Sequence, residues 1–504
     1  MSKLEELKLL AGQNKSIAII GLGRENCQFL KWLIEVVNFP KKQIFLADQK
    51  PLAQVGPEAL SCLQTYVFSD QQCVFGQNYL SVLEKPNLAL VFKSPGIWSL
   101  KPKFQAFRQA YGQDKVCSSL VFFLEKYRQQ IIGVTGTKGK STTSNLTTHL
   151  INSVSNLKAV YCGNSVNLSP YVFWTTLNQV VDPTQFFVLE LSSFQLQDLG
   201  FSQISPRCAL ITNYYVDHLD QHKDTREYWA SKDNLFLFQK PEDFCLVGPS
   251  VLQNSLHPEF IVNKALDHTE VEKYKQTFTS SLMGEHNWFN LILSLKVTEF
   301  VTGKKVLADK TLYQQAISSY SGLPHRLELV RTVQLQNLTI NFFDDGYATD
   351  PDAVVAAIRA LSKPGEYLWL QLCGKDKGAP VENLFLAILE TQQNLSLFRV
   401  DFCGEIGLKV QNLFNQTLGL EVAQEIQSFR QTVSRSFVSI QKIQQDFWAW
   451  LQAQQQALNP NQLVNLDIKT VLNIVLSPGG SSFDEFNNQQ ERAEWWVKKV
   501  QELK

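Results

Sequence analysis

Residues 131–143 read Ile131-Ile132-Gly133-Val134-Thr135-Gly136-Thr137-Lys138-Gly139-Lys140-Ser141-Thr142-Thr143. The apolar start predicts a buried strand, and the glycines before Lys140 predict a tight turn that opens a helix. Backbone N–H groups of such a turn and of the helix N-terminus bind phosphate oxygens. Lys140 would reach the β- and γ-phosphates of a nucleoside triphosphate, and the Ser141 hydroxyl would bind Mg²⁺. The stretch therefore predicts an ATP site.

The spacing of this loop departs from the common G-x-x-x-x-G-K-S/T pattern. Val134 stands where the first glycine is expected, and the glycine falls one residue earlier, at Gly133. A coincidental glycine turn is the alternative, but it does not account for Gly-Lys-Ser-Thr-Thr directly after an apolar strand. The loop therefore indicates a particular subclass of phosphate-binding loop.

Length and composition predict a soluble protein of several domains. A chain of 504 residues is too long for one core, so two to four domains are expected. Because 47 basic residues balance 47 acidic ones, no global attraction to nucleic acid or to a membrane is expected. Nine scattered cysteines without a C-x-x-C pair predict reduced thiols. The N-terminus lacks the apolar core of a secretory signal, so we expect a cytoplasmic enzyme that does not insert into the membrane.

Residues 1–116 are expected to form a Rossmann-like domain, because short apolar strands alternate with an amphipathic run. A glycine turn, Gly21-x-Gly23, follows the first strand, and Asp48 follows the second. Asn26 replaces the third glycine of a dinucleotide motif, so the turn alone is weak evidence for NAD(P). With Asp48 and the turn Ser94-Pro95-Gly96, it favours a pocket for a nucleotide diphosphate. The strands are 16–20, 43–47 and 88–92, and the amphipathic run is 27–37.

Two further α/β domains are expected over residues 117–322 and 323–504, because strands and helices keep alternating. This alternation predicts doubly wound, parallel sheets, which bind ligands at the carboxyl ends of their strands. The glutamine-rich residues 437–462 are expected to form a surface helix and loop. The central domain is predicted to have a helix over 118–128 and, after the loop, strands 186–190 and 208–212. The last domain is predicted to have strands 338–343, 367–372, 398–402 and 471–476.

Polar side chains follow two of the central strands. Glu190 and the hydroxyls of Ser192 and Ser193 suit Mg²⁺, but either serine could instead cap a helix, with Glu190 as a solvated charge. The next strand leads to His218 and His222. Zinc would need a third ligand of matching spacing, which the stretch lacks, so Mg²⁺ is favoured here too. Other ligand-type residues of this stretch are Asn213, Asp217 and Asp220.

Two helical segments also carry two interpretations each. Lys232 lies on a helical pattern and, judged from its neighbours, is a surface lysine. Gly284-Glu-His-Asn287 begins an amphipathic helix, which Asn287 would cap while Asn290 lies on its solvated face. Alternatively, the two amides line an adenosine or phosphate pocket.

In their order along the chain, these segments resemble the Mur ligase family, the ATP-dependent amide ligases of peptidoglycan precursor synthesis. The resemblance covers essentially the whole chain. Thr135–Ser141 is similar to the family's T-G-T-N-G-K-S/T loop, with Lys138 in place of asparagine. Three segments resemble the E-L-S-S-F-Q-L, L-P-H-R and L-S-P-x-x-A-S-x-D-x-F motifs of the members that add D-glutamate to UDP-N-acetylmuramoyl-L-alanine. They are Glu190–Leu196, Leu323–Arg326 and Leu476–Phe486, the last followed by Arg492.

The resemblance implies a role for each candidate residue. The catalytic residues would be Lys140, Lys232, His218 and Glu190, and two Mg²⁺ ions would be held by Ser141, Glu190, His218 and Lys232. Carbamylation of Lys232 would turn a cation into an oxygen ligand. Contacts to ATP would come from Gly136, Thr137, Lys138, Gly139, Lys140, Ser141, Thr142, Asn287, Asn290, Arg326 and Asp345. The UDP substrate would contact Gly23, Asp48, Ser94, Gly96, Asn164, Ser193 and Gln195. D-Glutamate would contact Thr349, Lys377, Ser482 and Phe486.

Two loops depart from the family pattern. The family's N-D-S-K-A-T-N loop reads Asp344-Asp-Gly-Tyr-Ala-Thr-Asp350, so Tyr347 replaces a lysine near the transferred phosphate. The G-G-x-D-K-G-x-D motif becomes Cys373–Pro380 and loses its first glycine and last aspartate. We hypothesise that Lys138 compensates for the cation missing at Tyr347.

The resemblance implies ligation through an acyl phosphate, carried out by a monomer whose last domain can close over ATP. One alternative is a sibling ligase that uses another amino acid, which the segment Ser482–Phe486 argues against. Another is a non-catalytic nucleotide-binding relative, supported by Tyr347. Retention of Lys140 and Lys232 argues against it.

Overall fold

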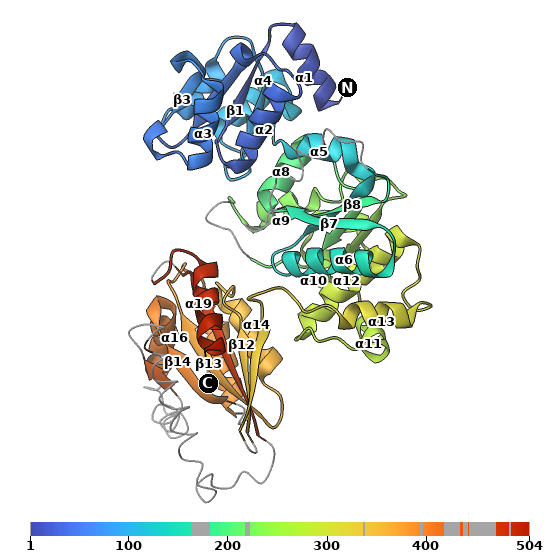
Figure 1. Ribbon diagram of the computed structural model, residues 1–504, viewed down its shortest axis with the longest axis vertical. Helices are drawn as coiled ribbons and strands as arrows, with labels where there is room; N and C mark the ends of the chain where they lie inside the picture. The colour runs from blue at the N-terminus through green and yellow to red at the C-terminus, as the bar shows by residue number, and fades with distance from the viewer. Residues whose placement is uncertain are drawn as a thin grey trace, which may run out of the picture. The chain divides into compact units, whose positions relative to one another are not determined.

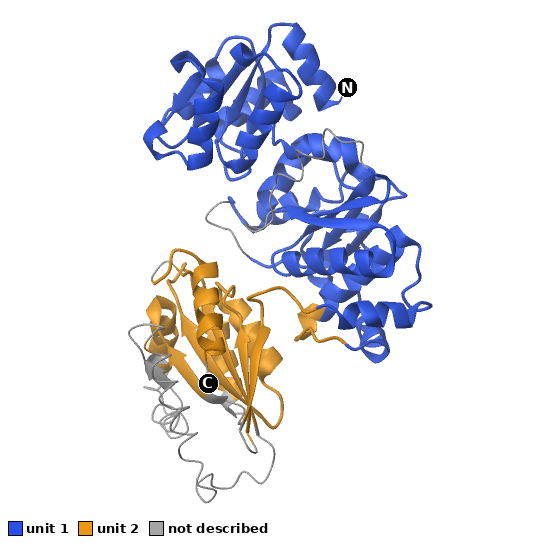
Figure 2. Cartoon of the chain, in the orientation of Figure 1, with its two compact units in different colours: residues 1–279, 288–320 blue, residues 280–287, 321–504 orange. Residues whose placement is uncertain are grey.

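The computed structural model divides the chain into two compact units. They are residues 1–279 with 288–320, and residues 280–287 with 321–504 (Figure 2). The structure describes residues 2–163, 182–216, 222–335, 338–393, 397–417, 434–436, 442, 470–482 and 485–502. Among these residues, no helix is long and apolar enough to cross a bilayer.

The first sheet of unit 1 has five parallel strands in the order β3-β2-β1-β4-β5 (Figure 1). The central strand β1 is buried along its whole length, as expected for a strand with helices on both faces. The strands are β1 Ser16–Ile20, β2 Ile44–Asp48, β3 Cys73–Phe75, β4 Leu88–Lys93 and β5 Val116–Cys117. The helices are α1 Lys3–Gly12, α2 Arg24–Glu35, α3 Pro57–Tyr66 and α4 Pro102–Tyr111.

The second sheet of unit 1 is also parallel, in the order β10-β9-β6-β8-β7. Strand β6 lies in its centre, so the loop that follows β6 opens at the carboxyl edge between β8 and β9. The strands are β6 Ile131–Thr135, β7 Lys158–Gly163, β8 Gln185–Glu190, β9 Cys208–Ile211 and β10 Phe244–Val247. The helices are α5 Leu120–Tyr127, α6 Lys140–Val154, α8 Ser193–Phe201, α9 Thr225–Asp233, α10 Pro249–Asn254, α11 His268–Thr277, α12 Glu285–Thr302 and α13 Lys310–Ser318.

Unit 2 holds a six-stranded sheet in the order β11-β12-β16-β13-β14-β15, in which only β11 runs antiparallel to its neighbour. Alternate residues of β13 serve two cores: Leu368 and Leu370 face the core under α14–α16, and Trp369 faces the core under α19. The strands are β11 Glu328–Leu335, β12 Leu338–Asp344, β13 Glu366–Cys373, β14 Leu397–Phe402, β15 Ser434–Ser436 and β16 Thr470–Gly479. The helices are α14 Pro351–Leu361, α15 Glu382–Gln393, α16 Gly404–Thr417 and α19 Gln489–Gln501.

The predicted α/β fold with parallel sheets is confirmed, and each predicted strand is present within one residue of its expected bounds, except that β16 runs to Gly479 instead of ending at residue 476. The antiparallel strand β11 and the short edge strands β3, β5 and β15 were not predicted. Domain boundaries after residues 116 and 322 stay predictions. Residues 437–462 lie outside the described residues, apart from Lys442.

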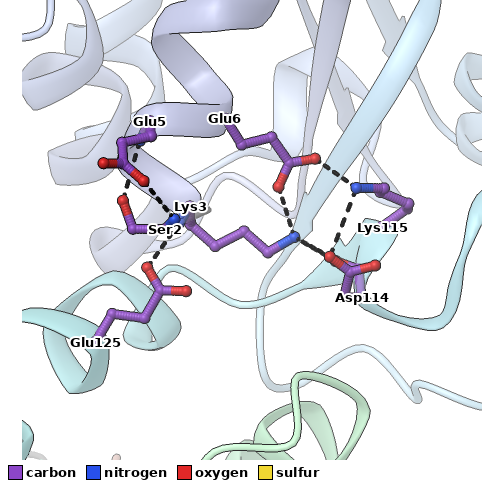
Figure 3. Close-up of polar contacts among 7 residues, drawn as sticks. All are labelled: Ser2, Lys3, Glu5, Glu6, Asp114, Lys115 and Glu125. Atoms are coloured by element: carbon purple, nitrogen blue, oxygen red, sulfur yellow. Dashed lines mark hydrogen bonds and ion pairs between the residues drawn. The ribbon is translucent and has the colours of Figure 1, made fainter.

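The N-terminal helix α1 is tied to unit 1 by buried ion pairs (Figure 3). Lys3 Nζ lies 2.8 Å from Glu6 Oε2 and 2.6 Å from Asp114 Oδ2, and Lys3 and Glu6 are buried. The Lys3 backbone N–H donates to Glu125 Oε2 of α5 at 2.7 Å. A capping box between Ser2 and Glu5 begins the helix. These contacts anchor α1 against both α5 and the segment before β5.

Candidate active site at the phosphate-binding loop

The loop between β6 and α6 has the backbone conformation that its glycines predict. Gly136 has φ +146° and Gly139 has φ +81°, in the left-handed region that side chains disfavour. A Cβ at Gly136 would also lie 1.9 Å from Thr212 Oγ1. Ser141 and Thr142 follow in the first turn of α6, where free N–H groups and the helix dipole favour an anion.

Two lysines converge on the carbonyl oxygen of Gly136. Lys140 Nζ donates to it at 3.0 Å and to Thr137 O at 2.9 Å. Lys232 Nζ donates to it at 3.0 Å and lies 4.5 Å from the centre of the Tyr228 ring. Lys232 is 1% exposed, so the interpretation as a surface lysine is wrong. The loop is therefore held by two cationic side chains from different helices.

Residues after β9 hold the other side of the loop. The Lys138 N–H donates to Asn213 Oδ1 at 2.9 Å, and Asn213 Nδ2 donates back to Lys138 O at 3.1 Å. The Thr212 hydroxyl donates to the same carbonyl at 2.5 Å. The Tyr215 N–H donates to the Thr137 hydroxyl at 3.0 Å. These bonds fix the loop chiefly through its own backbone.

The two candidate amides of α12 fall in different places. Asn290 is buried, and its Oδ1 accepts from the Thr143 hydroxyl at 3.2 Å. A Cβ on Gly139 would lie 2.7 Å from the same oxygen, so Asn290 borders the phosphate loop and does not lie on a solvated face. Asn287 belongs to unit 2, and its Nδ2 donates to Met283 O at 2.6 Å.

Glu190 ends β8 beside the phosphate loop, paired in register with Val134. Its side chain is buried, and the Tyr161 hydroxyl donates to Oε2 at 2.5 Å. Glu190 is thus not a solvated charge. A buried carboxylate at the end of the strand that pairs with β6 offers the kind of oxygen ligand that Mg²⁺ prefers. His218, Asp217, Asp220 and Asn164 lie outside the described residues.

At the start of α8 the two serines do different things. Ser192 is the helix cap in a capping box with Gln195, so the capping interpretation of Ser192 is confirmed. Ser193 is buried, and its Oγ lies 2.9 Å from His222 Nε2. His222 Nδ1 lies 3.1 Å from Glu227 Oε1. The side-chain polar atoms of Ser193 and Gln195 therefore contact other groups of the protein.

The predicted residues for the UDP end gather after β1, β2 and β4. The Leu22 N–H donates to Asp48 Oδ2 at 2.7 Å, which joins the glycine turn to the end of β2. A Cβ on Gly21 would lie 2.8 Å from the Ser94 Cβ, so these two turns are in contact. Gly23, at the start of α2, and Gly96 face open space. The structure therefore brings Gly23, Asp48, Ser94 and Gly96 to one edge of the first sheet.

In unit 2, Asp345 is a buried carboxyl after β12. The Ser477 hydroxyl donates to Oδ2 at 2.7 Å, and the Leu327 N–H donates to Oδ1 at 3.1 Å. Burial raises the pKa of Asp345 to about 7, although the Ser477 hydrogen bond and the nearby Arg326 charge oppose the shift. The Arg326 guanidinium lies 5.9 Å from the centre of the Tyr347 ring. The cation at this loop is thus Arg326, which stacks on the residue that replaces the expected lysine.

The predicted glutamate contacts of unit 2 follow β12, β13 and β16, and the segments after β13 and β16 pair with each other. The Lys375 N–H donates to Ser481 O at 2.8 Å, and the reverse bond is 3.0 Å. Ser482 is buried, and Phe486 lies 5.6 Å from the Trp495 ring. Three further residues complete this region: exposed Lys377, half-buried Thr349 before the α14 cap, and buried Arg492, which donates to the Gly346 and Gly480 carbonyls.

Tyr161 and Tyr228 were missed by the sequence interpretation. Tyr228 could have been found, because it lies four residues before Lys232 and therefore on the same face of α9. Tyr161 gave no such signal, since only the pairing of β7 with β8 brings it to Glu190. Among described residues, the only group of side chains that could bind a metal ion is His325, Glu328 and Asp344 in unit 2. Within this group, His325 Nδ1 lies 2.5 Å from Asp344 Oδ2.

The comparisons with known proteins agree with this geometry. Residues 134–250 match the Mur ligase middle domain. The chain is 26% identical over 388 residues to a UDP-N-acetylmuramoylalanine–D-glutamate ligase of Clostridium botulinum (strain Loch Maree / Type A3), covering 73% of this chain and 77% of the relative. A ligase of the same name from Clostridium kluyveri is 27% identical over 393 residues, with the same coverage.

Among solved structures, a UDP-N-acetylmuramate-alanine ligase from Thermotoga maritima is similar with a TM-score of 0.46 and 14% identity. The similarity covers 96% of this chain and 99% of that one. The match to the Mur ligase middle domain spans the phosphate loop, Lys232 and the strands between them, so this part of the chain is similar to Mur ligases.

Proposed function

We propose that this chain is an ATP-dependent ligase that joins D-glutamate to UDP-N-acetylmuramoyl-L-alanine, releasing ADP and phosphate. The observation that carries the proposal is the meeting of Lys140 and Lys232 on the phosphate loop, beside the buried carboxylate Glu190. The names of the two clostridial relatives support the choice of substrates. We further propose that it works as a monomer in the cytoplasm.

The proposed reaction has two steps. An oxygen of the substrate carboxylate attacks the γ-phosphorus of ATP, and the bond from that phosphorus to ADP breaks. The amine of D-glutamate then attacks the acyl carbon, the bond to phosphate breaks, and the amine gives up a proton. Neither step needs a protein nucleophile, so the protein contributes by positioning groups and by stabilising phosphoryl charge.

The residues at the loop fit the tasks that this reaction sets. The α6 N-terminus and Lys140 would hold the phosphates. Ser141 and Glu190 offer oxygen ligands for Mg²⁺, which would neutralise phosphate charge when bound. We propose that Lys232 is carbamylated and, with His218, completes a second Mg²⁺ site. In the unmodified chain, Lys232 instead donates to Gly136 O.

A single assay tests this function. Purified protein is given ATP, Mg²⁺ and UDP-N-acetylmuramoyl-L-alanine, and ADP release is followed with D-glutamate, L-glutamate or meso-diaminopimelate. We expect release only with D-glutamate, and a product whose mass equals the joined substrates less one water. Release with meso-diaminopimelate or L-glutamate alone would assign a sibling ligase. ADP release that never requires an amino acid would contradict ligation.

A non-catalytic nucleotide-binding relative is the second candidate, because Tyr347 and Arg326 stack where the family places a lysine. This candidate predicts that ADP binds while phosphate release stays at the level of a blank in every substrate mixture. Measuring ADP affinity in the same preparation separates it from a protein that simply lost its fold.

A further inference from the structure

A cluster of fully buried charges joins the first sheet to α8, away from the phosphate loop. Lys93 Nζ, at the end of β4, lies 2.8 Å from Asp198 Oδ2, and neither side chain is exposed at all. Asp198 lies on the same helix as Ser193 and Gln195. Lys93 directly precedes the turn that contains Ser94 and Gly96. The ion pair therefore connects the two sets of residues assigned to the UDP end of the substrate.

A second set of contacts supports Asp198. The Ser99 hydroxyl donates to Asp198 Oδ1 at 2.5 Å, and Arg108 Nη1 donates to Ser99 O at 2.6 Å. The Arg108 guanidinium stacks 3.7 Å from the centre of the Phe201 ring, which is also on α8. The two carboxylate oxygens of Asp198 thus contact Lys93, just before the 94–99 segment, and Ser99 at its end.

The same segment also contacts α9. The Trp98 Nε1–H donates to Glu227 Oε1 at 3.2 Å. Glu227 Oε1 in turn lies 3.1 Å from His222 Nδ1, and His222 Nε2 lies 2.9 Å from Ser193 Oγ. Residues 94–99 therefore contact both α8, which carries Ser193 and Gln195, and α9, which carries Lys232.

Stability alone is a weak reason for this arrangement. Burial lowers the pKa of Lys93, which the Asp198 charge opposes, and burial lowers the pKa of Arg108 to about 10. Buried ion pairs often stabilise a fold no more than apolar side chains of the same volume would. What a buried pair does provide is one defined geometry, since any displacement leaves a charge without its partner.

We propose that Asp198 is a positioning residue, which holds residues 94–99 against α8 so that the two halves of the UDP-substrate site form one pocket. The proposal rests on the proposed function for the identity of the substrate. Asp198 acts through Lys93 and Ser99 and does not touch the substrate itself. Its loss should therefore weaken substrate binding and leave nucleotide binding at the phosphate loop unchanged.

The experiment compares Asp198→Asn with a matched control, Asp243→Asn. Asp243 forms an ion pair with Arg128 elsewhere in unit 1, with side chains 1% and 16% exposed. For each variant, calorimetry measures the affinity for UDP and for ADP, and kinetics give KM for UDP-N-acetylmuramoyl-L-alanine and kcat. We expect Asp198→Asn to weaken UDP binding and raise this KM by about ten- to a hundredfold, with ADP affinity unchanged. Asp243→Asn should change neither.

Equal UDP affinity in wild type and Asp198→Asn would overturn the proposal, as would an equal loss in both variants. If Asp198→Asn does not fold, Ser99→Ala decides, because it removes one bond to Asp198 without leaving a buried charge unpaired. We expect about a threefold loss of UDP affinity in Ser99→Ala, and no change would overturn the proposal.

Amide hydrogen exchange separates this proposal from the proposed function. In ligand-free protein, residues 94–99 should lose protection in Asp198→Asn and keep it in Asp243→Asn. If the wild type binds no UDP but this loss occurs, the substrate assignment fails and the holding role of Asp198 stands. Unchanged protection would remove that role whatever the reaction is.

Discussion

The phosphate loop of unit 1 and the loops that follow β12 and β16 in unit 2 are built from different ionisable groups. At the phosphate loop, two ammonium groups meet on the carbonyl of Gly136, next to the N-terminus of α6. In unit 2, the carboxyl groups of Asp344 and Asp345 are buried. The comparison shows that the loop of unit 1 gathers ammonium groups, while the loops of unit 2 combine buried carboxyl groups with Arg326 and the Tyr347 ring.

The two regions also hold their loops differently. In unit 1 the loop is fixed by side chains that bond its backbone, those of Thr212, Asn213 and Lys232. In unit 2 a single buried arginine joins two loops, since Arg492 donates to the carbonyls of Gly346 and Gly480. A change at the phosphate loop should therefore affect catalysis first, whereas a change in the unit 2 loops should affect folding first.

The largest effect is expected for Lys140→Ala. The substitution removes the ammonium group that lies over the phosphate loop, so stabilisation of phosphoryl charge should be lost. We expect turnover in the ADP-release assay to fall by about a thousandfold, while the thermal unfolding temperature changes little. Lys304→Ala, at an exposed position of unit 1, is the control. Normal turnover in Lys140→Ala would contradict the assignment of this loop to ATP.

Next in size is the contrast between Gly136→Ala and Gly346→Ala. At Gly136 the new methyl group would lie 1.9 Å from Thr212 Oγ1 and φ is +146°. We expect a loss of about 3 kcal/mol in the free energy of unfolding and of all measurable ADP binding. At Gly346 the methyl group would lie 2.5 Å from the Ala493 Cβ in α19, so unit 2 should be destabilised.

ADP binding should survive in Gly346→Ala, measured by calorimetry below its unfolding temperature. If Gly136→Ala binds ADP normally, the phosphate loop is less constrained than the contacts with Thr212 imply. If Gly346→Ala loses ADP binding while folded, the separation of roles between the two loops is wrong.

The two regions also differ in how much of their structure could be predicted from the sequence. The phosphate loop was predictable because its strand, glycines and helix lie within thirteen consecutive residues. The burial of Lys232 was not, because the Gly136 carbonyl that it contacts lies 96 residues away in the sequence. Likewise, the partner of Asp345 is Ser477, more than a hundred residues away. Asp198 gave no signal either, since its partners lie in another domain of the sequence.

A third prediction concerns pH. Burial raises the pKa of Asp345 to about 7 in the folded protein, above the value of an unfolded aspartate. The unfolded chain therefore ionises first, and the free energy of unfolding should fall as pH rises from about 4 to about 7. Asp345→Asn removes this ionisation. Relative to wild type, its stability should improve by about 2 kcal/mol between about pH 5 and about pH 7, measured by urea denaturation.

The control for the pH experiment is Asp376→Asn. Asp376 lies in the same unit, and its pKa is lowered, because the Lys409 hydrogen bond and charge and the backbone hydrogen bonds of Gly378 and Lys377 together outweigh burial. Its carboxylate stabilises the fold only above the unfolded pKa, so this variant should lose stability relative to wild type as pH rises through the acidic range. Parallel pH curves for wild type and Asp345→Asn would show that Asp345 is ionised throughout.

The smallest effect is expected for substitutions of Lys138 in unit 1 and Tyr347 in unit 2. The backbone N–H and carbonyl of Lys138 are hydrogen-bonded to the Asn213 side chain. The Tyr347 ring lies 5.2 Å from the His325 ring and 5.9 Å from the Arg326 guanidinium. If Lys138 replaces the cation missing at Tyr347, Lys138→Asn should lower kcat/KM for ATP by about three- to tenfold.

Tyr347→Lys should then restore activity in the Lys138→Asn background and change little alone. The two residues belong to different units, and the proposed coupling between them acts through the bound nucleotide. A double-mutant cycle on kcat/KM measures this coupling, with Tyr347→Phe as the control for loss of the hydroxyl. Unchanged kinetics in Lys138→Asn, or strictly additive effects, would mean that the loss at Tyr347 is met by Arg326 or not at all.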